Sequence, residues 1–272
     1  MTLIRIDDSD RVRRITFDRP EALNAFNEAL YDATAEALID AAGAPGIAVV
    51  VLTGNGRAFS AGTDVVEMAL LNAGEHVLGV HGFSGMVDQL ASFPKPLICA
   101  VNGIALGIGA TMLGLADLVF MSADARVRCP FTALAVAPEA ASSFTFPLLM
   151  GRQSASWALM SSEWLSAEEC VATGLAWRVC APERLLDETM AHARVLAAKP
   201  IASLVETKRT IVASLRESIA LARERENQAF GRLMGTPANV EALTALAERR
   251  QPDFIAIDEE FPAGRADLAP DR

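Results

Sequence analysis

The first half of the chain alternates between two hydrophobic patterns. Short apolar runs, which are typical of strands buried on both faces, alternate with stretches whose apolar residues recur every three to four positions, as in helices. Ahead of them, the polar residues Asp8, Ser9 and Asp10 separate two apolar runs and predict a hairpin. This alternation predicts an α/β fold. We expect strands at 2–6, 12–17, 47–54, 97–101, 117–122 and 125–129, and helices at 27–42, 65–71 and 76–92.

The second half is mostly helical from about residue 143 onward. Its helices are expected at 143–150, 152–160, 167–173, 183–198, 200–213, 216–234 and 237–250, with one strand at 177–180. The last residues are rich in Asp, Glu, Pro and Gly, which is typical of a loose tail. The chain therefore divides into an α/β core at 1–199, a helical region at 200–250 and a tail at 251–272.

Composition narrows the class of function. The chain has 272 residues, 51% of them hydrophobic, but no apolar run reaches the ~20 residues of a membrane span, so no membrane partner is expected. The net charge of −10 argues against nucleic acid, whose binding draws on clustered Lys and Arg. The four cysteines and three histidines lack metal-ligand spacing, so no metal is expected. The N-terminal residues lack the pattern of a secretory signal, and we expect a cytoplasmic protein.

Two glycine-containing turns follow two of the apolar runs. The run at 47–54 leads to AGTD at 61–64, and the run at 97–101 leads to GIG at 107–109. Each turn places unpaired backbone N–H groups at the start of a helix, where negative charge is favoured. If the turns face each other, they can hold one oxyanion between two N–H donors. Alternatively, each is an ordinary connection between a strand and a helix.

Other glycine motifs fail on spacing. Gly114 follows Gly109 by five positions, so the GxGxxG fingerprint of a dinucleotide fold is absent. Ser84 stands in GFSGM, which lacks the GxSxG spacing of a nucleophile elbow. The oxyanion hypothesis is therefore the sharper one.

Several separated motifs resemble one family in order and spacing. They are RPEALNAFN at 19–27, AFSAGTDVVEM at 58–68, KPLICAVNGIALGIGATMLGLADLVFMSADARV at 95–127, LSAEECVATGLAWRV at 165–179 and AAKPIASLVETKR at 197–209. Together they are similar to the enoyl-CoA hydratase/isomerase (crotonase) superfamily over roughly residues 1–250. The resemblance implies a crotonase-like spiral of ββα units with a C-terminal helical trimerisation region. It also implies an acyl-CoA thioester substrate, no separate cofactor because coenzyme A is part of the substrate, and a homotrimer or hexamer.

The resemblance carries over to particular residues. In this family the thioester oxygen is held by two backbone N–H groups, which here belong to Thr63 and Ile108. Arg57 matches a basic residue that meets the nucleotide phosphates, although an ordinary exposed turn residue is the alternative. The remaining positions expected along the substrate and coenzyme A are Asn24, Ala25, Ala61, Gly62, Asp64, Val65, Gly107 and Phe131.

The reaction follows from which carboxylates are present. Hydratases of the family use two glutamates, and the matching positions here are Thr111 and Phe131. Instead, Glu139 stands in APEAASSFTFPLLMG at 137–151, which resembles the peroxisomal-type Δ3,Δ2-enoyl-CoA isomerase branch and its single catalytic glutamate. We therefore expect a shift of the double bond from 3-enoyl-CoA to 2-enoyl-CoA with Glu139 as proton shuttle. Its basicity would be raised by the apolar side chains of Phe131, Phe144 and Phe146.

Three alternatives remain. The first alternative concerns Glu139, which could be a solvated glutamate in the first turn of a helix, where the helix dipole favours negative charge. The second alternative concerns the reaction: the protein could be an enoyl-CoA hydratase-like enzyme or another acyl-CoA lyase or hydrolase of the same fold. A non-catalytic acyl-CoA-binding protein is the third possibility.

Overall fold

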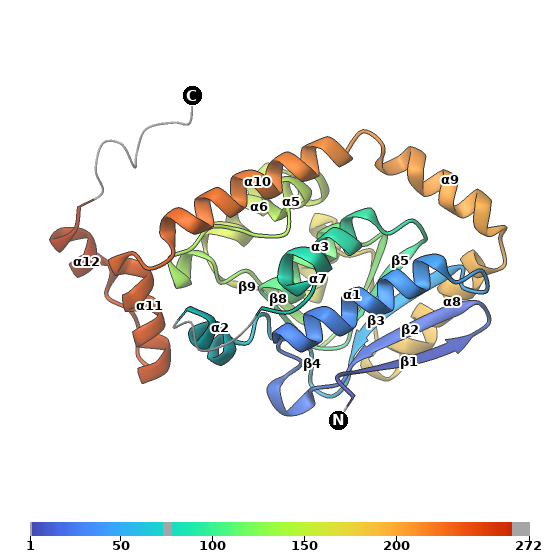
Figure 1. Ribbon diagram of the computed structural model, residues 1–272, viewed down its shortest axis with the longest axis horizontal. Coiled ribbons are helices and arrows are strands. Elements are labelled where there is room, and N and C mark those ends of the chain that lie inside the picture. The colour runs from blue at the N-terminus through green and yellow to red at the C-terminus, as the bar shows by residue number, and fades with distance from the viewer. Residues whose placement is uncertain (1, 73–77, 263–272) are drawn as a thin grey trace.

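Two β-sheets organise the first two thirds of the chain. The structure, a computed structural model, describes residues 2–72 and 78–262 (Figure 1). The larger sheet has the strand order β1-β2-β3-β5-β7-β10, and its strands pair in parallel except for the β1–β2 hairpin. These strands are β1 (Ile4–Ser9), β2 (Val12–Phe17), β3 (Val49–Gly54), β5 (Leu97–Val101), β7 (Leu118–Ser122) and β10 (Arg178–Cys180).

Of the strands in the second sheet, the sequence pattern predicts only the one at 125–129. The order of this sheet is β4-β6-β8-β9, and its members are β4 (Ala58–Ser60), β6 (Ile104–Leu106), β8 (Arg126–Arg128) and β9 (Trp164–Ser166). Each of the strands β3, β5 and β7 is followed by one strand of this smaller sheet and then by a helix. The chain therefore winds as a spiral of ββα units, which confirms the expected fold class.

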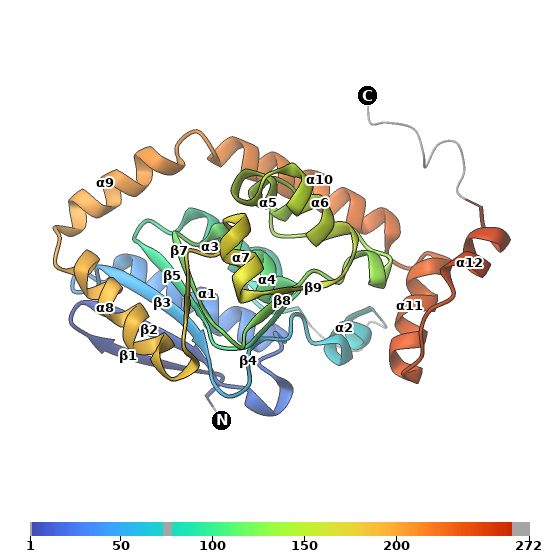
Figure 2. The same cartoon turned by 180° about the vertical axis from the view of Figure 1, so that it is seen from behind.

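Helices cover both faces of the larger sheet. Side chains alternate along its strands, since successive residues of a strand point to opposite faces. Val50 and Leu52 pack toward α1 (Glu28–Gly43) and α3 (Gly82–Ser92), whereas the intervening Val51 packs toward α8 (Leu185–Ala197) on the other face. Figure 2 shows α8 in front of this sheet. The expected helix at 76–92 begins only at Gly82, and residues 76 and 77 lie outside the described residues.

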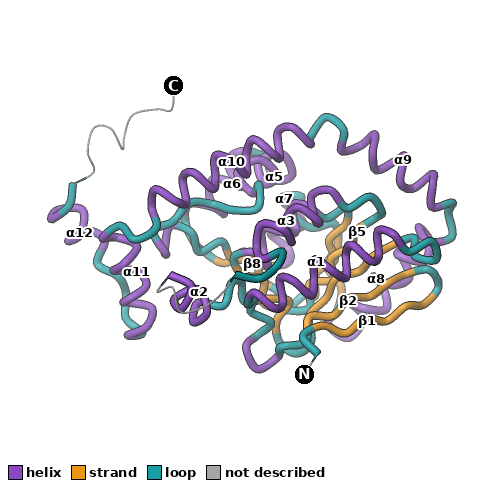
Figure 3. Tube along the Cα trace, in the orientation of Figure 1, coloured by secondary structure: helices purple, strands orange, loops and turns teal. Residues whose placement is uncertain are grey.

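The helical region leaves the core and returns to it. α9 (Ile201–Val212) extends away from the sheet, and α10 (Arg216–Leu233) runs back over α5 (Ser142–Met150) and α6 (Arg152–Met160) (Figures 1 and 3). α11 (Pro237–Glu248) follows near α2 (Val65–Asn72). No helix formed by the described residues is both long and apolar enough to cross a membrane.

The expected loose tail contains a helix. α12 (Phe254–Glu260) begins where the Asp253 carboxylate accepts a hydrogen bond from Ala256 N at 3.1 Å. This N-cap satisfies one of the N–H groups that a helix start leaves unpaired. The described part of the expected tail is therefore partly helical.

Candidate active site

The two glycine turns lie against each other. β4 and β6 pair in parallel, so the turns that follow them leave the same edge of the small sheet. A Cβ atom built on Gly62 would lie 3.7 Å from Gly107 Cα and 3.0 Å from the Leu106 carbonyl oxygen. Both glycines have positive φ, 89° at Gly62 and 53° at Gly107, which side chains rarely permit. Local backbone geometry thus requires glycine at both turns and brings them together.

Each turn presents an unpaired donor. In the described part of the chain, no hydrogen bond is formed by the N–H of Thr63 or by that of Ile108. Ile108 is the first residue of α4 (Ile108–Thr111), and the first N–H groups of a helix have no partner within it. By contrast, Gly107 N donates to the Arg128 carbonyl at 3.1 Å, which fixes the turn. The pair of free N–H groups is the arrangement of an oxyanion hole.

Glu139 faces these turns. It lies in the bend before α5, and its Oε1 atom is 3.9 Å from the position that a Cβ on Gly107 would occupy. Burial, and secondarily the negative charge of Glu226, raises the pKa of Glu139 to about 8. A carboxylic acid with this pKa both accepts and donates a proton near neutral pH.

Two cavities meet at Glu139. We name the cavity beside Gly107 the outer cavity and the one beside Tyr31 the inner cavity; their volumes are about 100 and 230 Å³. Thr63, Glu139 and Phe230 line both. Apart from these three, the outer cavity is lined by Ala61, Gly62, Val65, Leu106, Gly107, Pro130, Phe131, Leu134, Val136, Met234, Asn239 and Leu243. The inner one is completed by Phe26, Glu28, Tyr31, Asp64, Glu67, Phe83, Pro138 and Asn227. A ligand can therefore pass the oxyanion turns and Glu139 with one part in each cavity.

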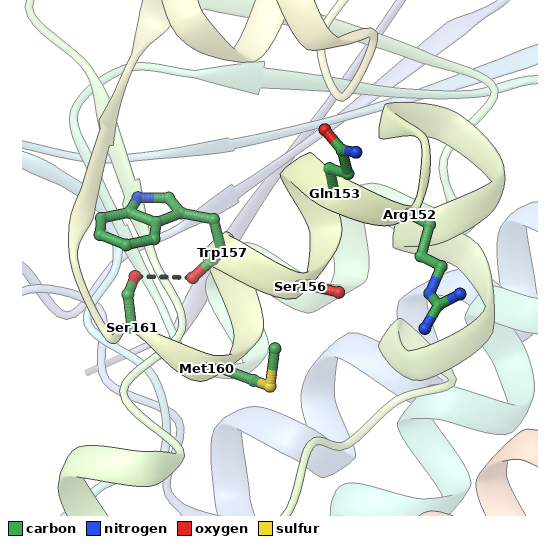
Figure 4. Close-up of a pocket in the computed structure, with 6 residues that line it drawn as sticks. All are labelled: Arg152, Gln153, Ser156, Trp157, Met160 and Ser161. Carbon is green, nitrogen blue, oxygen red and sulfur yellow. Dashed lines mark hydrogen bonds between the residues drawn. The ribbon is translucent and has the colours of Figure 1, made fainter.

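A separate hollow on α6 lacks this chemistry. Figure 4 shows its lining, which includes the exposed side chains of Trp157 and Met160 and a hydrogen bond from Ser161 Oγ to the Trp157 carbonyl at 2.6 Å. It contains neither a glycine turn nor a carboxylate and shares no residue with the cavities at Glu139. Among the described residues, no three His, Cys, Asp or Glu side chains are grouped so that they could hold a metal ion.

Comparison with known proteins identifies the family. The family model described as enoyl-CoA hydratase/isomerase matches residues 7–256. The chain belongs to the enoyl-CoA hydratase/isomerase family. The chain is thus an acyl-CoA enzyme of the crotonase superfamily.

Relatives of this enzyme carry different activity names. A 1,2-epoxyphenylacetyl-CoA isomerase of Escherichia coli is 32% identical over 89% of this chain and 94% of its own. The enoyl-CoA delta isomerase 2 of Rattus norvegicus is also 32% identical, over 82% of this chain and 58% of its own. A crystal structure of an enoyl-CoA hydratase from Mycobacterium marinum has 60% sequence identity and a TM-score of 0.75, covering 78% of this chain and all of that one. Family membership therefore fixes the thioester chemistry but not the reaction.

Two of the expected coenzyme A positions of this family member are structural. The buried Asn24 side chain accepts from Arg19 N at 2.9 Å and donates to the Asn55 and Ala58 carbonyls at 2.9 and 2.8 Å. The Asp64 carboxylate forms an ion pair with Arg19 at 3.1 Å and accepts from the N–H groups of α2. Both side chains therefore hold the turns in place, and Asp64 also lines the inner cavity. That these two positions contact coenzyme A stays a prediction.

Most other expected site residues surround the cavities. Ala61, Gly62, Thr63, Val65, Gly107, Phe131 and Glu139 line the outer one, and buried Ile108 follows directly after Gly107. Half-buried Ala25 contributes its carbonyl to Arg19 Nη1 at 2.5 Å. Arg57 is exposed between β3 and β4 and forms no ion pair with another described residue.

The aromatic surroundings of Glu139 differ from the expected set. Phe131 lines its cavity, but Phe144 lies in the groove beneath α9 and α10, and Phe146 is buried in the core. Their place is taken by Phe230 of α10 and by Tyr31 of α1, whose hydroxyl is hydrogen-bonded to Thr63 Oγ1 at 2.8 Å. Sequence periodicity identifies these residues as helical but does not show which face meets the cavity.

The helical region also closes the site. Phe230 and Met234 lie in and directly after α10, and Asn239 and Leu243 belong to α11; all four line the outer cavity. Asn239 is held there by a hydrogen bond from its side-chain amide to the Leu134 carbonyl at 2.9 Å. The region expected only to mediate oligomerisation therefore forms one wall of the site.

Proposed function

We propose that this family member moves the double bond of a 3-enoyl-CoA to the 2-position, with Glu139 as the only proton carrier. The observation that carries the proposal is the composition of the outer cavity. Among the described residues that line it, Glu139 is the only ionisable one. Double-bond migration needs one group that removes and returns a proton, whereas hydration needs groups that both activate water and deliver a proton.

The first step creates an enolate. The thioester oxygen accepts hydrogen bonds from the N–H groups of Thr63 and Ile108, and the Glu139 carboxylate removes a proton from carbon 2. The electron pair of the broken C–H bond spreads over the dienolate, with negative charge developing on the thioester oxygen. Each N–H donor at such a position contributes about 3 kcal/mol to transition-state stabilisation.

The second step regenerates the base. Protonated Glu139 delivers the same proton to carbon 4, the electron pair forms the bond to that proton, and the remaining double bond lies between carbons 2 and 3. The pKa of about 8 suits both steps, since a weaker base would not remove the proton and a stronger one would not return it.

Hydration is disfavoured by the two positions that match family glutamates. Thr111 is fully buried in α4 and lines neither cavity, and Phe131 presents an apolar ring to the outer one. Neither can activate or hold a water molecule as a base. The aromatic side of the inner cavity, formed by Phe26, Tyr31 and Phe83, receives the acyl chain beyond Glu139. The carboxylates of Glu28, Asp64 and Glu67 also line this cavity. Exposed Arg57 receives the phosphates of the nucleotide.

The test is the Glu139→Gln variant assayed with 3-hexenoyl-CoA. The amide keeps the size of the side chain but cannot act as a base, so turnover is expected to fall by about 10²–10⁴-fold while binding of the acyl-CoA is retained. Glu183→Gln, which removes a charge from an exposed position, is the matched control. Hydration of 2-hexenoyl-CoA is measured in parallel.

Each outcome separates one alternative. Unchanged isomerisation by the Glu139→Gln variant would remove Glu139 from the mechanism. Wild-type protein that hydrates 2-hexenoyl-CoA faster than it isomerises 3-hexenoyl-CoA would be a hydratase. Wild-type protein that binds acyl-CoA without converting it would be a non-catalytic binding protein.

We also propose assembly into homotrimers or dimers of trimers. Large apolar side chains are exposed on the single chain, among them Trp157 at 59%, Met160 at 65% and Ile211 at 65%. Apolar surface of this kind is typical of subunit contacts. Light scattering at micromolar concentration is expected to give three or six times the chain mass of 28.9 kDa, and a monomer would contradict the proposal.

A further inference from the structure

Glu226 of α10 is a buried carboxylate outside the reacting centre. Only 4% of its surface is exposed. Its Oε2 atom accepts a hydrogen bond from Ala141 N at 2.7 Å, and its Oε1 atom accepts one from Ser143 N at 2.8 Å. Both oxygens therefore bind the backbone that directly follows Glu139, although Glu226 lies more than eighty residues away in the chain.

The backbone that Glu226 holds is strained. Ala140 and Ala141 have φ values of 56° and 60°, so two consecutive residues with side chains adopt the left-handed conformation. Such residues persist only where the surroundings hold them in place. The bend is closed locally by Ser142, whose N and Oγ donate to the Glu139 carbonyl at 3.0 and 2.7 Å. Glu226 satisfies two further N–H groups, that of Ala141 just before α5 and that of Ser143 in its first turn.

The charge of Glu226 is not neutralised by an ion pair with any described residue. Arg223, one turn earlier on α10, is directed elsewhere, since it pairs with Asp88 and donates to the Ser84 carbonyl of α3 at 3.2 Å. The Glu226 carboxylate is held by the N–H groups of Ala141 and Ser143 instead. Burial raises the pKa of Glu226, while these hydrogen bonds and the charge of Arg223 act in the opposite direction.

Among the other described groups that face Glu139, we find no positively charged side chain either. Tyr31 of α1 contributes a hydroxyl that is bonded to Thr63, and Cys129, after β8, contributes a thiol. The inner cavity adds the carboxylates of Glu28, Asp64 and Glu67. Asp64 is paired with Arg19. Glu28 accepts a hydrogen bond from Gly79 N, and Glu67 accepts one from Glu28 N. Glu226 is the carboxylate whose charge, after burial, acts on the pKa of Glu139.

We infer that Glu226 is a positioning residue, which fixes the bend that carries Glu139 and makes the active site depend on the docking of α10 onto the core. The inference rests on Glu139 being the catalytic base, as proposed above. Glu226 does not touch the substrate; it acts through the backbone of Ala141 and Ser143 and through its charge. Since α10 also supplies Phe230, the same docking event closes the cavity and aims the base.

The Glu226→Gln variant separates charge from shape. Glutamine keeps the length of the side chain and one acceptor oxygen, but it loses the negative charge and places an amide against an N–H group. We expect kcat for 3-hexenoyl-CoA to fall at least about tenfold with KM changed less than about threefold, because Glu139 is misaligned rather than the substrate lost. The apparent pKa in the pH profile of kcat is expected to move down by about one unit, because a neighbouring negative charge has been removed.

Glu224→Gln is the matched control. It removes the same charge from an exposed position on the same helix, two residues away, and is expected to leave kcat and the pH profile unchanged. Circular dichroism and light scattering verify that each variant is folded and assembled like the wild type. A Glu226→Gln variant with an unchanged pH profile and unchanged kcat would overturn the inference. A fall in kcat accompanied by an equally large rise in KM, without a shift of the pH profile, would overturn it too.

A titration that does not depend on turnover tests the coupling between Glu226 and Glu139 separately from the proposed isomerase activity. The ionisation of the Glu139 carboxyl can be followed by carbon-13 NMR in wild type and in Glu226→Gln. A lower pKa of Glu139 in the variant supports the coupling even if the isomerase activity itself is absent. The same pKa in both proteins refutes the coupling even if the isomerase activity is present.

Discussion

Catalysis requires the ionised form of Glu139. This form is expected to lower the stability of the folded protein. Burial raises the pKa of Glu139 from 4.5 to about 8. Between these values the folded protein keeps a proton that the unfolded chain releases. The contribution of protonated Glu139 to stability is therefore fully present below pH 4.5 and is lost as the pH rises through about 8.

The magnitude follows from the same two pKa values. At 1.36 kcal/mol per pKa unit, the difference between 4.5 and about 8 corresponds to roughly 5 kcal/mol. This figure is an upper bound, because the side chain borders a cavity that admits solvent in the free protein. We therefore expect the free energy of unfolding of the wild type to be lower at pH 9 than at pH 5 by roughly 2–4 kcal/mol from this residue alone.

The perturbation that isolates this contribution is Glu139→Gln. Since glutamine does not ionise, the variant is expected to match the wild type within about 1 kcal/mol at pH 5 and to be more stable by roughly 2–4 kcal/mol at pH 9. Urea unfolding at one fixed protein concentration measures both values, because assembly makes stability depend on concentration. Exposed Glu183→Gln serves as control and is expected to follow the wild type at both pH values. A stability difference between Glu139→Gln and wild type that is the same at pH 5 and pH 9 would refute the reasoning.

Three further predictions concern activity. The rate of isomerisation at low substrate concentration is expected to rise with pH and to level off above about 8, because Glu139 must be ionised to act as base; a rate that falls over this range would exclude it. Gly107→Ala is expected to lower kcat by about a hundredfold, because alanine disfavours the φ of 53° that aims the Ile108 N–H; steady-state kinetics measure this, and an unchanged kcat would separate that N–H from catalysis. Arg57→Ala is expected to raise KM by about three- to tenfold at low salt with kcat nearly constant. The difference in KM between variant and wild type is expected to shrink as salt is added. A KM equal to that of wild type would leave Arg57 an ordinary turn residue.

The central strands β3 and β5 of the larger sheet are readable from sequence because they are almost uniformly apolar. β3 and β5 are buried on both faces, and their apolar runs end at glycine or asparagine. The strands β4, β6 and β9 have three residues each, so they are too short to show a period of two. They exist because neighbouring turns of the spiral bring them into register, which is a tertiary cause.

The residues proposed to react with the substrate were predictable for a similar reason. Thr63 and Ile108 stand in glycine turns whose local sequence determines the backbone, and Glu139 stands in a motif that resembles one branch of the family. Glu226 and Phe230 are not marked in this way, because their roles arise from the docking of α10 across the molecule. A helical pattern shows that α10 is amphipathic but does not identify its partner.

The electrostatics of the outer cavity explain why a single carboxylate in its described wall suits the proposed reaction. Glu139 already lies near Glu226, and like charges at short range raise each other's pKa. Additional glutamates at positions 111 and 131 would raise the pKa of Glu139 further, so that it would be largely protonated at neutral pH and a poor base. Thr111 and Phe131 are uncharged, and the Thr111 hydroxyl is buried without a hydrogen-bond partner among the described residues. The described wall of the outer cavity thus carries Glu139 as its one base. This favours a reaction in which the proton that is removed is also the proton that is returned, which is the double-bond shift.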